Sequence, residues 1–314
     1  MTEEAKASRA ALTVLAKGNG SGKLSHKKPS RWLYPFAAEH RYAQSYRAWV
    51  KPVCSFVNEY LKKHGDVIFR GDSKEYVARM DAVTGRSFSI MVDSLNGWVD
   101  AYLPSDEDKI EASPVFRGLE SIADSTFEFN GKQYDKAVKS ALGVKFPSDE
   151  SWWVVARKQW ALANYNLIQS DLKRYIADIN SVTELAVTNG WSVKILSEKI
   201  NSIDTKLSRN RANFIARDQT GKLNGTVSQH RMEDIGLTMY EWSSANDESV
   251  RESHALMEGL LCRWDDASVY SDDNGKTWKP RPSGAVLMHP GMDYQCRCVA
   301  LAWFNEIIDG IAAL

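Results

Sequence analysis

The chain is poor in cysteine and carries no segment that marks secretion or membrane insertion. Its four cysteines, Cys54, Cys262, Cys296 and Cys298, are too few for the disulfide framework of a small secreted protein. No apolar run is long enough to span a bilayer. The first residues, MTEEAKASRAA, lack the charged-then-apolar pattern of a signal peptide. We therefore expect a protein made in a reducing cytoplasm, with no membrane partner.

An excess of one charge and the common catalytic motifs are also lacking. Lysine plus arginine and aspartate plus glutamate number 40 each, so the chain as a whole has no general attraction to nucleic acid or membrane. The sequence contains no H-E-x-x-H, no G-x-S-x-G and no well-placed G-x-G-x-x-G. We predict that the protein is not an enzyme.

The chain does contain enough apolar material for a packed core, since 43% of its residues are hydrophobic and 11% aromatic. Residues 1–30 differ from the rest, because GNGSGK and SHKKPS are rich in glycine, serine and lysine. This composition predicts a flexible basic arm. GNGSGKL is not a phosphate-binding loop: Lys17 stands where that motif needs its first glycine, and Leu24 where it needs serine or threonine.

Residues 31–206 are expected to form a mainly helical region. Aromatic and apolar residues recur at helical spacing from Tyr42 to Tyr60, although Pro52 should kink or divide that helix. Asn130-Gly131 in FEFNGKQY suits a type I′ turn and predicts a small hairpin near 127–134. A long helix should begin near Trp152 and stop at Asn189-Gly190, and a short helix should follow from about Val193.

Residues 207–304 are expected to form a compact domain of helix and strand, followed by a tail at 305–314. Its first part should be helical segments broken around Gly221 and Gly225 and ending at Gly236. LTMYEWSS then alternates as a strand does, and ESVRESHALMEG, capped by Asn246 or Asp247 and closed by Gly259, should be a helix. The whole chain is therefore predicted to be α+β, with a mostly helical N-terminal two-thirds.

The stretch YSDDNGKTW, residues 270–278, matches the Asp-box turn of sialidase-like propellers. In those proteins the motif is structural and comes in several copies, whereas it occurs once here. We predict a turn between two strands, with Asn274-Gly275 at the bend, and no glycosidase.

Cys296 and Cys298 lie one residue apart in HPGMDYQCRC. On a strand, residues i and i+2 point to the same face, so the two sulfurs would lie side by side and Arg297 would turn away. A disulfide between them would close a strained ring. Two adjacent thiolates instead suit a zinc ion, which takes four nitrogen or sulfur ligands.

Three other residues are candidates to complete such a zinc site. His254 is the preferred third ligand, and Cys262 and His289 compete for the fourth position. The alternative is ordinary packing, because free cysteines are often buried and His254 shares an apolar helical face with Met257 and Leu261.

Three stretches, RANFIARDQ, YEWSSANDESVRESHALMEG and HPGMDYQCRC, occur in this order. Together they resemble the C-terminal domain of the phage Mu F-like minor head proteins, also called phage head morphogenesis proteins. The corresponding features are an arginine-rich helix, a tryptophan strand, an Asp-x-x-Val-Arg-x-x-His helix and a His-Pro element that leads into Cys-Arg-Cys. In this chain they are Arg211 to Arg217, Trp242, Asp247 to His254 with Gly259, and His289 to Cys298.

The resemblance, which covers about residues 207–300, implies a virion component rather than a metabolic enzyme. Such proteins associate with the portal vertex in the host cytoplasm during assembly, so the implied partners are the portal protein and other head proteins. Implied roles are head assembly, DNA packaging or ejection, and the basic arm could touch packaged DNA. The alternative function is a metal-dependent hydrolase or nuclease built around His254, His289 and the Cys-x-Cys pair.

This chain departs from the family at one point. Some members have Cys-x-x-Cys where this chain has Arg251 to His254, and an arginine cannot replace a thiolate. The resemblance therefore does not supply four metal ligands. For Arg211, Arg217, Arg251 and Arg297 we expect structural pairing with carboxylates such as Asp247 or Asp293.

Overall fold

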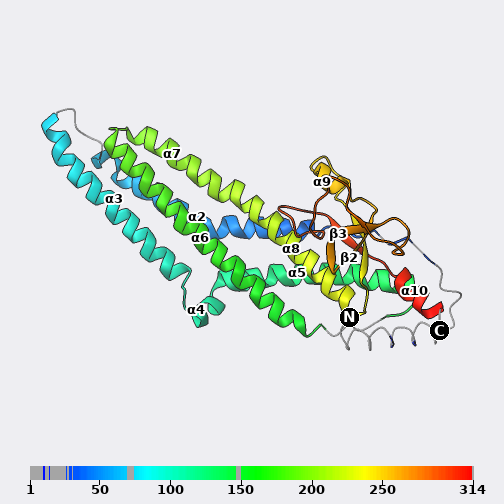
Figure 1. The fold of residues 1–314 in the computed structure, drawn as a ribbon. Helices are drawn as coiled ribbons and strands as arrows, with labels where there is room; N and C mark the ends of the chain where they lie inside the picture. The colour runs from blue at the N-terminus through cyan, green and yellow to red at the C-terminus, as the bar shows by residue number, and fades with distance from the viewer. Residues whose placement is uncertain are drawn as a thin grey trace. The chain divides into compact units, whose positions relative to one another are not determined.

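The computed structural model describes residues 31–68, 74–145 and 150–312, together with Ala10, Val14, His26, Lys28 and Pro29. The predicted arm of residues 1–30 thus lies almost entirely outside the described residues. Long helices and one small antiparallel sheet make up the described chain (Figure 1), which confirms the predicted α+β class. Over these ranges no helix combines the length and apolar character needed to cross a membrane.

The helices account for most of the described chain. Their bounds are α2 Phe36–Ile68, α3 Lys74–Tyr102, α4 Glu107–Ala112, α5 Pro114–Leu142, α6 Trp152–Thr188, α7 Val193–Thr205, a π-helical segment η1 Lys206–Arg211, α8 Ala212–Asp234, α9 Glu252–Ala255 and α10 Asn305–Ala312. The predicted start of α6 at Trp152 is confirmed, and Gly190, with φ +60°, follows its end as expected. Helix α2 is undivided, because it continues through Pro52.

The chain divides into two compact units, each with its own apolar core. The first, which we call the helical unit, comprises residues 40–122 and 158–216. Its core is built from α2, α3, α5, α6, α7 and α8. Buried hydroxyls there are satisfied locally, since Tyr42 donates to Asn164 at 2.7 Å and Tyr46 donates to Asp171 at 2.9 Å.

The second unit, which we call the mixed unit, comprises residues 1–39, 123–157 and 217–314. Its sheet has the strand order β4-β3-β2-β1-β5 and is antiparallel throughout. The strands are β1 Met239–Ser243, β2 Leu261–Arg263, β3 Asp266–Ser271, β4 Lys279–Pro280 and β5 Val299–Ala302. Strand β1 was predicted, and its buried Tyr240 and Trp242 face the core.

The turn between β3 and β4 was also predicted. Asn274 and Gly275 have φ of 62° and 84°, as a type I′ bend requires. Ser271 accepts from the Gly275 amide at 2.9 Å, and Asp273 accepts from the Thr277 amide at 2.9 Å. These bonds give the Asp-box residues a structural role.

The predicted hairpin near 127–134 is wrong, because the whole stretch lies inside α5. Asn130 is fully buried and donates to Asn224 and Ser228 of α8, at 3.1 and 2.8 Å. Arg231 donates to the Asn130 side chain at 2.8 Å and fills the space that a Cβ at Gly131 would need. Tertiary packing thus overrides the local turn preference of Asn-Gly.

Three smaller predictions also need correction. Helix α8 is not broken at Gly221 and Gly225 but runs continuously to Asp234. The helix expected over ESVRESHALMEG shrinks to the four residues of α9, since Asp247 instead accepts from the Ser249 amide in a local turn. The segment predicted as a tail at 305–314 contains α10.

Candidate functional site

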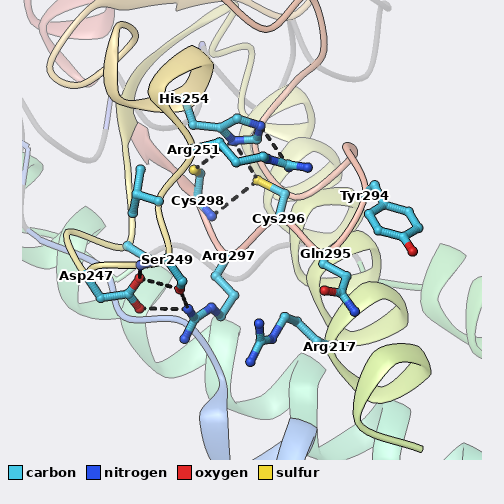
Figure 2. Close-up of a pocket in the computed structure, with 12 residues that line it drawn as sticks. Arg217, Asp247, Ser249, Arg251, His254, Tyr294, Gln295, Cys296, Arg297 and Cys298 are labelled. Atoms are coloured by element: carbon cyan, nitrogen blue, oxygen red, sulfur yellow. Dashed lines mark hydrogen bonds and ion pairs between the residues drawn. The ribbon is translucent and has the colours of Figure 1, made fainter. Parts of the chain in front are cut away.

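His254, Cys296 and Cys298 come together in the mixed unit. The Nδ1 atom of His254 lies 3.4 Å from the sulfur of Cys298 and 3.5 Å from the sulfur of Cys296. One potential metal-binding atom from each residue lies within 4.8 Å of the other two, and all three residues are buried. Figure 2 shows both sulfur atoms beside the imidazole ring. These residues could hold a metal ion.

A turn, not a strand, positions the two cysteines. Strand β5 begins at Val299, so the prediction that a strand carries both cysteines is wrong in detail. The chain bends sharply before them, with φ of 83° at Gly291 and 51° at Gln295. The amides of Gly291 and Cys298 both donate to the sulfur of Cys296 at 3.4 Å. The turn therefore wraps Cys296 with hydrogen-bond donors.

Helix α8 provides the surface on which this turn rests. A Cβ atom at Gly221 would clash with the carbonyl oxygen of Cys296, and one at Gly225 would come within 2.6 Å of the carbonyl oxygen of Pro290. The two glycines are four residues apart and therefore share one helical face. Because neither has a side chain, the backbone of the turn can approach the backbone of the helix closely.

The other ring nitrogen of His254 is held by charged partners. Nε2 lies 2.9 Å from the Asp293 carboxylate and 2.9 Å from the Arg251 guanidinium, which in turn pairs with Asp293 at 2.8 Å. The indole of Trp242 packs edge-on against the ring, with centroids 5.9 Å apart. A carboxylate on Nε2 fixes the ring orientation and leaves Nδ1 facing the sulfurs.

Electrostatics favour a thiolate at Cys296. A hydrogen bond from the Cys298 thiol, together with one from His254, outweighs burial and lowers the pKa of Cys296 to about 5. The pKa of Cys298 is raised, because its proton is held by Cys296 and burial disfavours a second anion. Burial lowers the pKa of His254, but its hydrogen bonds to Cys296 and Asp293 raise it overall. These shifts favour the thiolate form of Cys296 and the protonated form of His254 beside it.

Cys262 and His289, the two candidates for the fourth position, do not belong to this group of three. Both lie against Tyr240 instead. The Tyr240 hydroxyl is 2.8 Å from His289 Nδ1, and Cys262 is hydrogen-bonded to the same tyrosine. Burial raises the pKa of the Cys262 thiol to about 11, and burial with the nearby Arg281 lowers the pKa of His289. These shifts favour the neutral form of both groups, the buried Cys262 and the partly buried His289.

A cavity of about 310 Å³ borders the three residues. Arg217, Arg251 and Arg297 line it, and each pairs with a carboxylate: Arg217 with Glu39 at 3.6 Å, Arg251 with Asp293 at 2.8 Å and Arg297 with Asp247 at 2.8 Å. In the helical unit Arg211 pairs with Asp171 at 3.0 Å. The predicted structural pairing of these arginines is confirmed.

Sequence reasoning missed two features that build the site. Asp293 was considered as an arginine partner and not as the group that orients His254. Gly221 and Gly225 were taken as helix breaks, although their four-residue spacing is the signal that could have marked them as a contact face. Both features depend on the fold that brings α8 and α9 to the turn before β5.

Comparison with known proteins finds a family model that matches the C-terminal region. Residues 177–301 match the family described as Phage Mu protein F like protein, which confirms the resemblance predicted from the sequence. The match begins within α6, upstream of residue 207. A relative from Haemophilus influenzae, an uncharacterized protein, is 28% identical over 267 residues, or 83% of this chain and 52% of the relative. The chain thus spans about half the length of that relative. No solved structure matches the chain.

Proposed function

We propose that this chain, whose residues 177–301 match the Phage Mu protein F like family, is a minor head protein of a tailed phage. The protein is located in the virion, and in the host cytoplasm during assembly. Its partners are the portal protein and other head proteins, and its role lies in head assembly, DNA packaging or ejection. The family match over the mixed unit's sheet and metal-ligand group is the observation that carries this proposal.

Loss of the gene tests this proposal. A phage that lacks it should form defective or poorly infectious heads, and the protein should co-purify with procapsids and bind isolated portal rings. Heads of normal structure and infectivity without the protein would contradict the proposal. Portal binding should persist in a variant that lacks residues 1–30, because the family match lies outside that segment.

We also propose that His254, Cys296 and Cys298 hold a zinc ion. In a tetrahedral zinc site, ligand atoms lie about 3.3–3.8 Å apart, and the two distances from His254 Nδ1 to the sulfurs, 3.4 and 3.5 Å, fit this spacing. The lowered pKa of Cys296 favours the thiolate, which is the form that metal binding requires. Asp293 on Nε2 gives the histidine the carboxylate partner that zinc-bound imidazoles usually have.

In this proposal the role of the ion is structural. It would link α9 to the turn before β5 and so contribute to folding free energy. The alternative function, a hydrolase or nuclease that uses both His254 and His289, gains no support from the geometry, because His289 Nδ1 faces Tyr240. We therefore propose a protein without enzymatic activity, to be checked by incubation of the zinc-loaded protein with labelled DNA.

A further inference from the structure

The helical unit contains a polar groove that the proposed head role does not use. Its volume is about 660 Å³, and α2, α7, η1 and α8 all contribute to its walls. Three cationic side chains line it: Arg47 and Lys51 from α2 and Arg209 from η1. The remaining lining residues are small or polar, and none is aromatic. The groove is therefore suited to a charged, hydrated ligand rather than an apolar one.

These three cations are not neutralised by carboxylates. In the part of the chain that the structure describes, neither Lys51 nor Arg209 has an ion-pair or hydrogen-bond partner, and both side chains are exposed. Arg47 donates to the neutral amide oxygen of Asn213 at 2.5 Å. Arg217, Arg251 and Arg297, which line the cavity beside His254, differ because each of them is paired with a carboxylate.

The single carboxylate in the groove is directed toward the protein. Asp204 accepts a hydrogen bond from Tyr175 at 2.6 Å and another from Asn58 at 2.7 Å. Both of its oxygens are therefore engaged by neutral donors from α6 and α2, and neither forms an ion pair with the cations. The groove retains an excess of positive charge on its open side.

The local backbone also sets this groove apart. Segment η1 is a π-helix, a rare conformation that is frequently found at functional sites. It places Leu207 in the core while Ser208 and Arg209 line the groove. Arg47 and Lys51 lie one helical turn apart, about 6 Å along α2, and Arg209 reaches the groove from a different element. Cations spread in this way suit several phosphates in a row better than a single one.

We propose that this groove binds the phosphate backbone of a single nucleic acid strand. Arg47, Lys51 and Arg209 contact successive phosphates, and the hydroxyl and amide groups of Ser55, Ser208 and Asn213 supply further polar contacts to the backbone. Because no aromatic side chain is available for base stacking among the lining residues, binding is electrostatic and independent of sequence.

The test uses the full-length chain and a fluorescently labelled single-stranded oligonucleotide of about 12 nucleotides. Anisotropy is measured as a function of salt for the wild type, for Lys51→Gln/Arg209→Gln, and for Lys62→Gln/Lys63→Gln. The control pair lies on the exposed side of α2, outside the groove lining, and removes the same charge. The N-terminal arm is present in every variant, so its contribution cancels in the comparison.

We expect the groove variant to bind at least tenfold more weakly at low salt and to lose about 1.4 from the slope of log affinity against log salt, or about 0.7 per phosphate contact. The control should stay within twofold of the wild type. Equal weakening of both variants, or no binding by the wild type, would overturn the proposal. Displacement of the oligonucleotide by millimolar inorganic phosphate at matched ionic strength would also overturn it, by identifying a small-anion site.

Discussion

His254 is buried in the mixed unit and carries a different partner on each ring nitrogen. Asp293 and Arg251 hold Nε2, whereas Nδ1 faces two sulfurs whose pKa values are driven apart. Without metal, Cys296 and His254 form a hydrogen-bonded pair, and with zinc they would be two ligands of a three-ligand centre completed by Cys298. The two states differ in their response to substitution at Cys296, because an isosteric hydroxyl can keep a hydrogen bond but cannot replace a thiolate ligand.

Cys296→Ser should therefore abolish zinc binding. Elemental analysis of freshly reduced wild-type protein should find about one zinc per chain, and that of the variant close to none. With free metal at about a thousand times Kd, the loss of binding removes about 4 kcal/mol from the free energy of unfolding. Thermal unfolding measures this loss, and a chelator should destabilise the wild type but not the variant.

Cys262→Ser is the matched control, since Cys262 is just as buried but faces Tyr240. This variant should keep its zinc. Zinc retained by Cys296→Ser, or lost equally from both variants, would contradict the assignment of the ligands.

His289 should make the mixed unit sensitive to acid. Burial and Arg281 lower the pKa of His289, so the folded state prefers the neutral ring. The unfolded chain takes up this proton near pH 6.5, and the stabilising contribution of the neutral ring is present above that pH and lost as the pH falls below it. Urea unfolding of His289→Gln should thus depend less on pH between 7.5 and 5.5 than that of the wild type.

His254 titrates with the opposite sign, because its pKa is raised. It is present in both proteins, so its contribution cancels in their difference. A wild-type acid sensitivity that His289→Gln leaves unchanged would show that His289 is not held neutral.

At the scale of single residues, the sequence predicted which residues form the cluster at His254, but not the residues that surround this cluster. The two-residue spacing of Cys296 and Cys298 predicted a pair of metal ligands, and His254, the preferred third ligand, lies beside both sulfurs. The positions of Cys262 and His289 could not be predicted, because the strand pairing that sets Tyr240 opposite Cys262 is a non-local property of the sheet.

Among the secondary-structure elements, α8 has a glycine at a position where close packing leaves no room for a side chain. Gly221→Ala should lower the free energy of unfolding by roughly 1–3 kcal/mol, because the new methyl group would clash with the Cys296 carbonyl. This outcome opposes helix propensity, which favours alanine by about 1 kcal/mol. Urea unfolding measures the change, and weaker zinc binding should accompany it, since the clash displaces a ligand.

Gly97→Ala in α3 is the matched substitution, because a Cβ there would meet nothing within 4 Å. It should raise the free energy of unfolding by about 1 kcal/mol. If Gly221→Ala stabilised the protein as much as Gly97→Ala, the close approach of the turn to α8 would be refuted.

Periodic elements were predictable from sequence, and those that depend on a partner were not. The apolar stripes of α2 and α6 and the alternation of β1 are periodic patterns, and the structure contains the helices and the strand that they predicted. FEFNGKQY carries a strong local turn signal, but the contacts of Asn130 and Gly131 with α8 make the helix more favourable. Those contacts join residues about a hundred positions apart, which no local pattern encodes.

On the scale of the whole molecule, two apolar cores exist within one chain. Helices α2, α5, α6 and α8 each contribute residues to both units. The proposed zinc ligands and their charged partners all belong to the mixed unit. The groove lined by Arg47, Lys51 and Arg209 belongs to the helical unit. A change at either proposed site should therefore affect the core of its own unit, so the contributions of the two sites to stability can be measured separately.

Removal of zinc should loosen the mixed unit selectively. Hydrogen exchange, followed by mass spectrometry with and without a chelator, should show faster exchange in β1, β5 and the turn at 289–298, because the metal contributes to local stability only where it binds. Peptides from the core of the helical unit, such as those around Tyr46 and Ile168, should exchange at unchanged rates. Cys296→Ser should reproduce the chelated pattern without chelator. Equal acceleration in both units would show that the cores unfold as one cooperative body, in which the shared helices transmit the loss of the metal across the chain.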